Sequence, residues 1–125
     1  SEAHMVVDTH KIDVMLSAWN MHDDDLLKRA VETALSDDIE FCDPHYDIRG
    51  HDAFIQMVKA FWAKNGRCGI RRASRIDAHH DRARYSWAID LPDGRRFDGF
   101  DAVTLDLASG KVRRVDGFFG PLAPL

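Results

Sequence analysis

Apolar residues in the first half of the chain recur with the spacing of an α-helix. Three segments have this spacing, residues 10–21, 24–36 and 51–65, and each carries one apolar stripe. The run Asp23–Asp25 supplies a capping residue and negative charge where the second segment begins. Asn65-Gly66 is a typical C-terminal signal after the third. The pattern therefore predicts three helices in the N-terminal half.

Beyond Gly66 the apolar period changes from 3.6 residues to 2, which is the period of a β-strand. Asp93-Gly94 is a strong hairpin signal, and Ser109-Gly110 is a second turn signal. Strands are predicted over residues 69–78, 82–91, 95–107 and 111–119, with one short strand, Ile39–Asp43, between the second and third helices. We therefore expect an α+β fold with three N-terminal helices packed on one face of a curved antiparallel sheet.

The length of 125 residues fits one domain, which we assign to residues 1–125. Residues 1–5 fit no structural period and are interpreted as a segment added ahead of the native start. With 45% hydrophobic residues the chain can form a core, yet no apolar run approaches the roughly 18–20 residues that span a membrane. No secretory signal is recognised, so a cytoplasmic location is expected. The net charge of −4 argues against a nucleic-acid-binding protein.

Two aspartates fall among the apolar positions of predicted strands. Alternate residues of a strand share one face, so Asp43 lies on the same side as Phe41, and Asp101 lies on the same side as Val103. Taken singly, each could be a hydrogen-bonded structural group or a strand-end residue displaced by a bulge. Together they fit poorly with an entirely apolar interior, because an unpaired buried charge costs several kcal/mol. A pocket between helices and sheet accounts for both.

Paired carboxylates in such a pocket suit proton transfer. Burial raises the pKa of a carboxyl group, so one aspartate can act as a base while the other stays protonated and donates a hydrogen bond to a developing oxyanion. Histidines near Asp43, His45 and His51, could relay protons, but surface positions are favoured for both. His79-His80 lacks the spacing of a zinc site, and no metal is predicted.

The order of elements and several local motifs resemble the nuclear transport factor 2-like superfamily. The motifs are Trp19-Asn20-Met21-His22-Asp23, Asp43-Pro44 and Arg49-Gly50-His51-Asp52-Ala53. Phe97 to Asp106 and Val112 to Phe119 make the chain most similar to the branch of ketosteroid isomerases and SnoaL-like polyketide cyclases. The resemblance implies a cone-shaped α+β barrel, a hydrophobic pocket inside the cone and a homodimer.

The resemblance also implies roles for individual residues. Asp43 matches the proton-shuttling aspartate of the isomerases, and Asp101 matches their protonated oxyanion-hole aspartate. Met15 stands where the family has an oxyanion tyrosine, and methionine cannot donate that hydrogen bond. Substrate-binding positions are expected on the first helix, the third helix and the last strand, namely Met15, Trp19, Val58, Trp62 and Phe119.

Two functions remain open at this stage. The first is a cofactor-independent isomerase, cyclase or lyase acting on a hydrophobic cyclic carbonyl compound, with Asp43 as base and Asp101 as hydrogen-bond donor. The second is a non-catalytic ligand-binding or dimerisation module of the same fold, which Met15 favours. An enclosed cavity reaching both carboxylates would favour the enzyme, and a filled cone would favour the module. Neither function calls for a membrane or a nucleic acid as partner.

Overall fold

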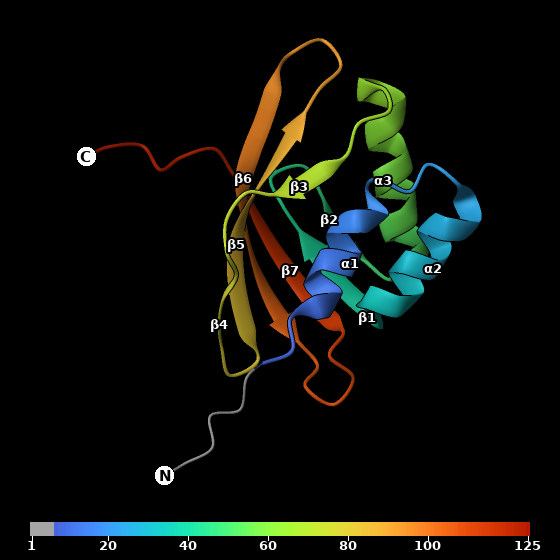
Figure 1. The fold of residues 1–125 in the computed structure, drawn as a ribbon, viewed down its shortest axis with the longest axis vertical. Coiled ribbons are helices and arrows are strands. Elements are labelled where there is room, and N and C mark those ends of the chain that lie inside the picture. The colour runs from blue at the N-terminus through green and yellow to red at the C-terminus, as the bar shows by residue number, and fades with distance from the viewer. Residues whose placement is uncertain (1–6) are drawn as a thin grey trace.

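The computed structural model describes residues 7–125, so the interpretation of residues 1–5 lies outside the described part. The N-terminal half contains helices α1 (His10–Ala18), α2 (Asp24–Ala34) and α3 (His51–Asn65). Strands β1 (Leu35–Cys42) and β2 (Asp47–Arg49) lie between α2 and α3. The C-terminal half consists of β3 (Ile70–Arg72), β4 (Asp77–His79), β5 (Arg82–Asp90), β6 (Arg96–Leu105) and β7 (Val112–Phe119). The helices lie together on one side of a single curved sheet (Figure 1).

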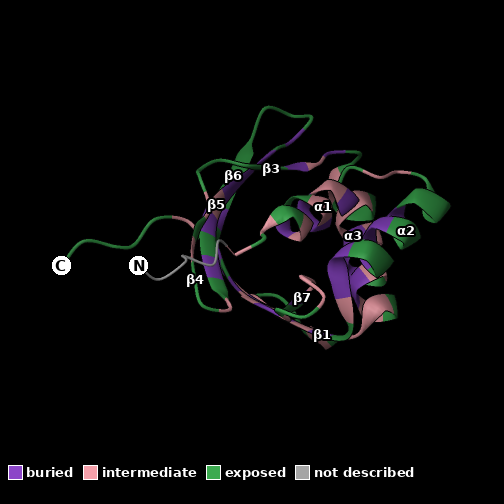
Figure 2. Ribbon diagram, turned by 60° about the horizontal axis from the view of Figure 1, so that its bottom comes forward, coloured by how far each residue is buried: buried purple, intermediate pink, exposed green. Residues whose placement is uncertain are grey.

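The sheet has the strand order β2-β1-β7-β6-β5-β3, and β4 pairs with β5 outside this path. It wraps around the helices without closing, since β2 and β3 form separate edges (Figure 2). The α+β cone is therefore confirmed, as an open cone rather than a closed barrel. One part of the prediction is wrong: β1 and β7 pair in parallel, so the sheet is mixed and not purely antiparallel.

Local differences from the predicted elements have identifiable causes. The first helix ends at Ala18, because the N–H groups of Trp19, Asn20 and Met21 bond to carbonyls three residues back and tighten the chain into a turn. The strand predicted over residues 69–78 is split into β3 and β4. Between them the hydroxyl of Ser74 accepts a hydrogen bond from the N–H of Ser86 at 2.9 Å, so a side chain replaces the backbone ladder.

The apolar stripes of the helices meet the concave face of the sheet. Ile12, Phe54 and Val58 are completely buried there. Along β5 and β6 the odd-numbered residues face this core, as the alternation in sequence predicts. Asp101 lies among them at 7% exposed and is the one charged side chain within residues 7–125 that is buried. None of the helices in that range is long and apolar enough to cross a membrane.

Candidate functional site

The carboxylate of Asp101 is held by two neutral donors on the adjacent strand. The hydroxyl of Tyr85 donates to Oδ2 at 2.8 Å, and the indole N–H of Trp87 donates to Oδ1 at 3.1 Å. The β5–β6 pairing sets this geometry, because Tyr85 lies directly opposite Asp101 and Trp87 lies opposite Gly99. Within residues 7–125, no lysine or arginine forms an ion pair with Asp101.

Burial raises the pKa of Asp101 to about 6, against an ordinary value of 3.8. Loss of solvent is the largest cause, and the nearby Asp43 carboxylate adds to it. The hydrogen bonds from Tyr85 and Trp87 act in the opposite direction, because they stabilise the ionised form. Asp101 can therefore change its charge close to the physiological pH range, which an ordinary aspartate does not do.

Asp43 directly follows β1 and approaches Asp101 across Gly117 of β7. A β-carbon built on Gly117 would lie 3.1 Å from Asp43 Cβ and 3.2 Å from Asp101 Oδ1. Oδ1 of Asp43 accepts hydrogen bonds from the backbone N–H groups of His45 and Tyr46, each at 2.8 Å. Asp43 is half-buried, and no partner for its Oδ2 lies within residues 7–125. The two predicted catalytic aspartates are thus brought together on the concave side.

An aromatic group lies beside this pair of carboxylates. The ring of Phe119 is 5.9 Å from that of Trp87 at 90°, and it is 5.3 Å from the ring of His45. Phe119 is 44% exposed, whereas Trp87 is 6% exposed. Of the predicted substrate-binding residues, Phe119 is the one that contacts the carboxylate site. Its ring packs against Trp87, and Trp87 bonds directly to Asp101.

The other predicted substrate-binding residues lie deeper in the helical layer. Met15 and Val58 are buried core residues. The indole N–H of Trp62 donates to the carbonyls of Trp19 and Cys68, both at 3.0 Å, and so ties α3 to the end of α1. Trp19 packs edge-on against Phe54, whose ring centroid is 6.1 Å away. Their packing roles are clear, and their contact with a ligand stays a prediction.

Neither Tyr85 nor Trp87 is among the site residues predicted from the sequence. A signal for both existed in the hairpin whose loop contains Asp93-Gly94. A three-residue loop, residues 92–94, places Tyr85 opposite Asp101 and Trp87 opposite Gly99, which is the register observed. A two-residue turn at Asp93-Gly94 would shift every pair by one residue. The alternation of residues along one strand identifies the face that a side chain occupies. The register between two strands identifies which residue on the next strand lies beside it.

No cluster of three or more His, Cys, Asp or Glu side chains suited to a metal ion occurs among residues 7–125. His79 and His80 contact each other through their Nδ1 atoms at 3.2 Å in the β4–β5 turn. His51 Nε2 lies 2.9 Å from the carbonyl of Leu35, where it joins α3 to β1. His45 is exposed and contacts the site through its backbone and through Phe119, so it is the histidine best placed to influence Asp43.

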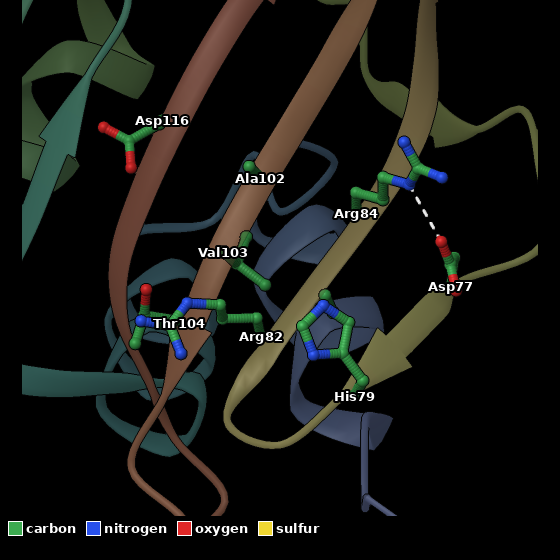
Figure 3. Close-up of a pocket in the computed structure, with 9 residues that line it drawn as sticks. Asp77, His79, Arg82, Arg84, Ala102, Val103, Thr104 and Asp116 are labelled. Carbon is green, nitrogen blue, oxygen red and sulfur yellow. Dashed lines mark hydrogen bonds and ion pairs between the residues drawn. The ribbon is translucent and has the colours of Figure 1, made fainter.

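Two hollows lie on the outer face of the sheet, away from the helices. The larger, about 460 Å³, is lined by polar side chains of β4, β5, β6 and β7, including Asp77, Arg84 and Asp116 (Figure 3). The second, about 300 Å³, lies beside Phe100. Neither hollow is lined by Asp43 or Asp101. The hydrophobic pocket that the resemblance implies inside the cone therefore stays a prediction.

Comparisons with protein-family models and with curated proteins give no match. Solved structures do match over most of the chain. A candidate isomerase of the SnoaL-like family from Agrobacterium tumefaciens str. C58 is 26% identical, with a TM-score of 0.82, over 94% of this chain and 100% of that one. A protein of unknown function from Exiguobacterium sp. 255-15, described as nuclear transport factor 2-like, is 21% identical with a TM-score of 0.73, over 90% and 99%.

A candidate ketosteroid isomerase from Kribbella flavida DSM 17836 is 17% identical with a TM-score of 0.70, and the match covers 94% of this chain and 80% of that one. At 17% identity the similarity concerns the fold alone. It agrees with the three helices and the open curved sheet described above. The resemblance recognised in the sequence is thereby confirmed. By its fold, the protein belongs to the nuclear transport factor 2-like superfamily, among SnoaL-like and ketosteroid isomerase-like proteins.

Proposed function

We propose that the protein is an isomerase or cyclase that acts on a hydrophobic cyclic carbonyl compound by proton transfer through Asp43 and Asp101. The observation that carries this proposal is that Asp43, through its Cβ, and Asp101, through its Oδ1, both lie over Gly117 on the concave side of the sheet. Neither has a lysine or arginine partner within residues 7–125 that would fix its charge. Two carboxyl groups with different surroundings can take the two roles that enolisation needs.

In the proposed reaction, Asp43 is the base. Its Oδ1 is occupied by two backbone N–H groups, which leaves Oδ2 to remove a proton from a carbon next to the carbonyl. The carbon–hydrogen bond breaks, an O–H bond forms on Asp43, and negative charge moves to the carbonyl oxygen. Asp101 donates a hydrogen bond to that oxygen in its neutral form. In a substrate with a carbon–carbon double bond next to the enolate, Asp43 returns the proton at the far carbon of the conjugated system, the carbonyl re-forms and the double bond shifts. These steps need no cofactor.

The comparisons support this class of reaction at the level of the fold. The SnoaL-like and ketosteroid isomerase-like neighbours are described as candidate isomerases, and another neighbour, from Sinorhizobium meliloti, as a candidate polyketide cyclase. Met15 supplies no donor from α1, so the hydrogen bond to the oxyanion falls to Asp101. Because Asp101 must be protonated for this role, catalysis should decline as the pH rises through about 6.

The proposal is tested by proton exchange, which needs no knowledge of the natural substrate. β-Tetralone, a bicyclic ketone, is incubated with the protein in deuterated buffer, and loss of its α-proton signals is followed by NMR. We expect the wild-type protein to accelerate exchange above the buffer rate. Asp43→Asn should lower the acceleration by about 10²- to 10⁴-fold, since that is the usual contribution of a general base.

Asp98→Asn is the matched control. Asp98 is exposed on the opposite face of β6, so removing its charge leaves the concave site intact. The amide oxygen introduced by Asp43→Asn can still accept the two backbone hydrogen bonds, and this variant should therefore fold. An Asp43→Asn variant that exchanges protons as fast as Asp98→Asn would exclude Asp43 as the base. No acceleration by the wild-type protein would count against the proposed reaction on cyclic ketones.

A second candidate function, a dimerisation module, is favoured by the outer face of the sheet. Phe100 and Phe118 form a cross-strand pair there and are 49% and 62% exposed. The charged residues that flank this pair are already paired within the chain, Arg84 with Asp77 on one side and Arg114 with Asp116 on the other. The exposed aromatic pair is therefore the part of this face that gains from being covered. A two-fold axis through the phenylalanines would pack the pairs of two copies against each other, so we propose a second copy of this chain as the occupant.

Sedimentation analysis tests this assembly. If the phenylalanine pair forms the centre of a homodimer interface, Phe118→Asp should weaken association by about 2 kcal/mol or more, as expected for a central aromatic residue. Leu107→Asp serves as the control, because Leu107 is 58% exposed in the β6–β7 connection, outside the paired strands of this face. A wild-type chain that sediments as a monomer at high concentration would rule the homodimer out.

A further inference from the structure

We infer that Tyr85 and Trp87 are positioning residues that hold the Asp101 carboxylate in one orientation and determine which protonation state it presents to a ligand. This inference rests on the proposed function and concerns how the same site is built. It assigns a role to two side chains that the family resemblance did not point to. The two residues act through Asp101 and are not themselves catalytic.

The geometry of the contacts carries the inference. Tyr85 and Trp87 bond to different oxygens of one carboxylate, at 2.8 Å and 3.1 Å, so together they fix both the position and the plane of the group. Both donors come from β5, and the paired backbone of β5 and β6 holds them opposite Asp101. All three side chains are buried, with exposures of 3%, 6% and 7% for Tyr85, Trp87 and Asp101.

Gly99 makes the position of Trp87 possible. A β-carbon on Gly99 would lie 2.6 Å from Cζ2 of Trp87 and 2.1 Å from the carbonyl oxygen of Phe118. The indole therefore crosses over Gly99 to reach Asp101 two residues further along β6. The absence of a side chain at residue 99 is part of the same arrangement, because any larger residue would displace the indole that holds Oδ1.

The two donors differ in what they permit. An indole N–H can only donate, so Trp87 favours the ionised carboxylate. A hydroxyl can donate to a carboxylate or accept from a carboxylic acid, so Tyr85 can remain bonded when Asp101 takes up a proton. The bond to the charged form is the stronger of the two. Loss of either donor should therefore favour the protonated state of Asp101.

Other charged groups around Asp101 are few. Asp43, at the end of β1, faces it across Gly117 and favours the protonated form. Beyond Tyr85, the Asp13 carboxylate on α1 pairs with Arg72 on β3 through bonds of 2.8 Å and 3.2 Å. That pair includes both signs of charge, so its net influence on Asp101 is small. Within residues 7–125, Tyr85 and Trp87 are thus the groups that stabilise the ionised form.

The test follows the proton on Asp101 directly. The protein is labelled with ¹³C at its aspartate carboxyl carbons, the Asp101 signal is assigned by its loss in Asp101→Asn, and the signal is titrated against pH. In Tyr85→Phe and in Trp87→Phe we expect the titration midpoint to rise, with proton binding about tenfold tighter for each lost bond. Ser86→Ala is the matched control, since it removes a hydroxyl from the outer face of β5 between the two donors, and its midpoint should equal that of the wild type.

The activity measurement distinguishes the inference from the proposed function. If Asp101 is the donor, the pH at which β-tetralone exchange declines should rise in the same variants as the NMR midpoint rises. A raised midpoint without any effect on exchange would support the positioning role and overturn the proposed function. An unchanged or lowered midpoint in both Tyr85→Phe and Trp87→Phe would overturn the positioning role, whatever the activity. Should Trp87→Phe fail to fold, Tyr85→Phe decides the test alone, because it removes the hydroxyl that bonds to Oδ2 and keeps the ring in place.

Discussion

On the outer face of the sheet, Asp77 lies 2.8 Å from Arg84, and Asp116 lies 2.9 Å from Arg114. On the concave face, the buried carboxylate of Asp101 has only the hydroxyl of Tyr85 and the indole of Trp87 as hydrogen-bond donors within residues 7–125. The same type of side chain thus has cationic partners on one face of β5–β7 and neutral partners on the other. An ion pair keeps both groups charged, whereas neutral donors leave the charge of the acid free to change.

The two kinds of partner have different effects on the pKa values of the groups they contact. Asp116 and Glu40 raise the pKa of Arg114, so its guanidinium group stays charged at any ordinary pH. Burial raises the pKa of Asp101 to about 6, where it can gain or lose a proton. We therefore expect the ion pairs of the outer face to keep their charges. The folded state, in contrast, does not need a charge on Asp101 to be stable. Substitutions that remove one charge from each face make this difference measurable.

Asp101→Asn should have the largest effect on stability, and it should stabilise. The pKa of Asp101 rises from 3.8 to about 6 on folding, so the native state binds more protons than the unfolded state between these values. Stability therefore falls as the pH rises through this range, and the full penalty, about 3 kcal/mol, is present above it. The neutral amide avoids the penalty. Urea unfolding at pH 7 should show the variant more stable, and at pH 4 the difference should nearly vanish.

Asp77→Asn is the outer-face counterpart. The Asp77–Arg84 pair is well exposed, so its loss should lower the free energy of unfolding by no more than about 1 kcal/mol. This effect is destabilising, opposite to that of Asp101→Asn, and it should become smaller at high salt. Equal effects of the two substitutions at pH 7 would contradict the distinction between the faces. A destabilised Asp101→Asn protein at pH 7 would mean that the charge of Asp101 is compensated by more than Tyr85 and Trp87.

The sequence predicts local elements better than distant pairings. The helices α2 and α3 appear close to their predicted bounds, because Asp23 accepts a bond from the N–H of Leu26 at 3.0 Å and Gly66 ends α3 with a positive φ of 84°. The parallel pairing of β1 with β7 has no local signal, since the two strands are far apart in the chain and come together only when the sheet forms.

In the candidate site, too, features within one strand are predicted better than contacts between strands. Parity places Asp101 in the core because it needs only the alternation within one strand, and the structure agrees. Tyr85 escaped notice because its importance depends on register, which couples β5 to β6. The same alternation places Asp43 on the interior face, but the contact of Asp43 and Asp101 over Gly117, a residue of a third strand, is indicated by neither aspartate's own strand. Contacts that involve three strands can be recognised only once the sheet is assembled.

Gly117→Ala tests this three-strand contact. The new methyl group would lie 3.1 Å from Asp43 Cβ and 3.2 Å from Asp101 Oδ1, so one of the two side chains must move. We expect a loss of about 1–3 kcal/mol, the usual cost of an added methyl group in a packed site. Trp87 holds Oδ1 in place, and the cost should therefore be lower in a Trp87→Phe background, where Asp101 can shift. A double-mutant cycle in urea measures this coupling. An equal cost in both backgrounds would mean that Asp43 yields instead, and that the Trp87 bond does not restrain the carboxylate.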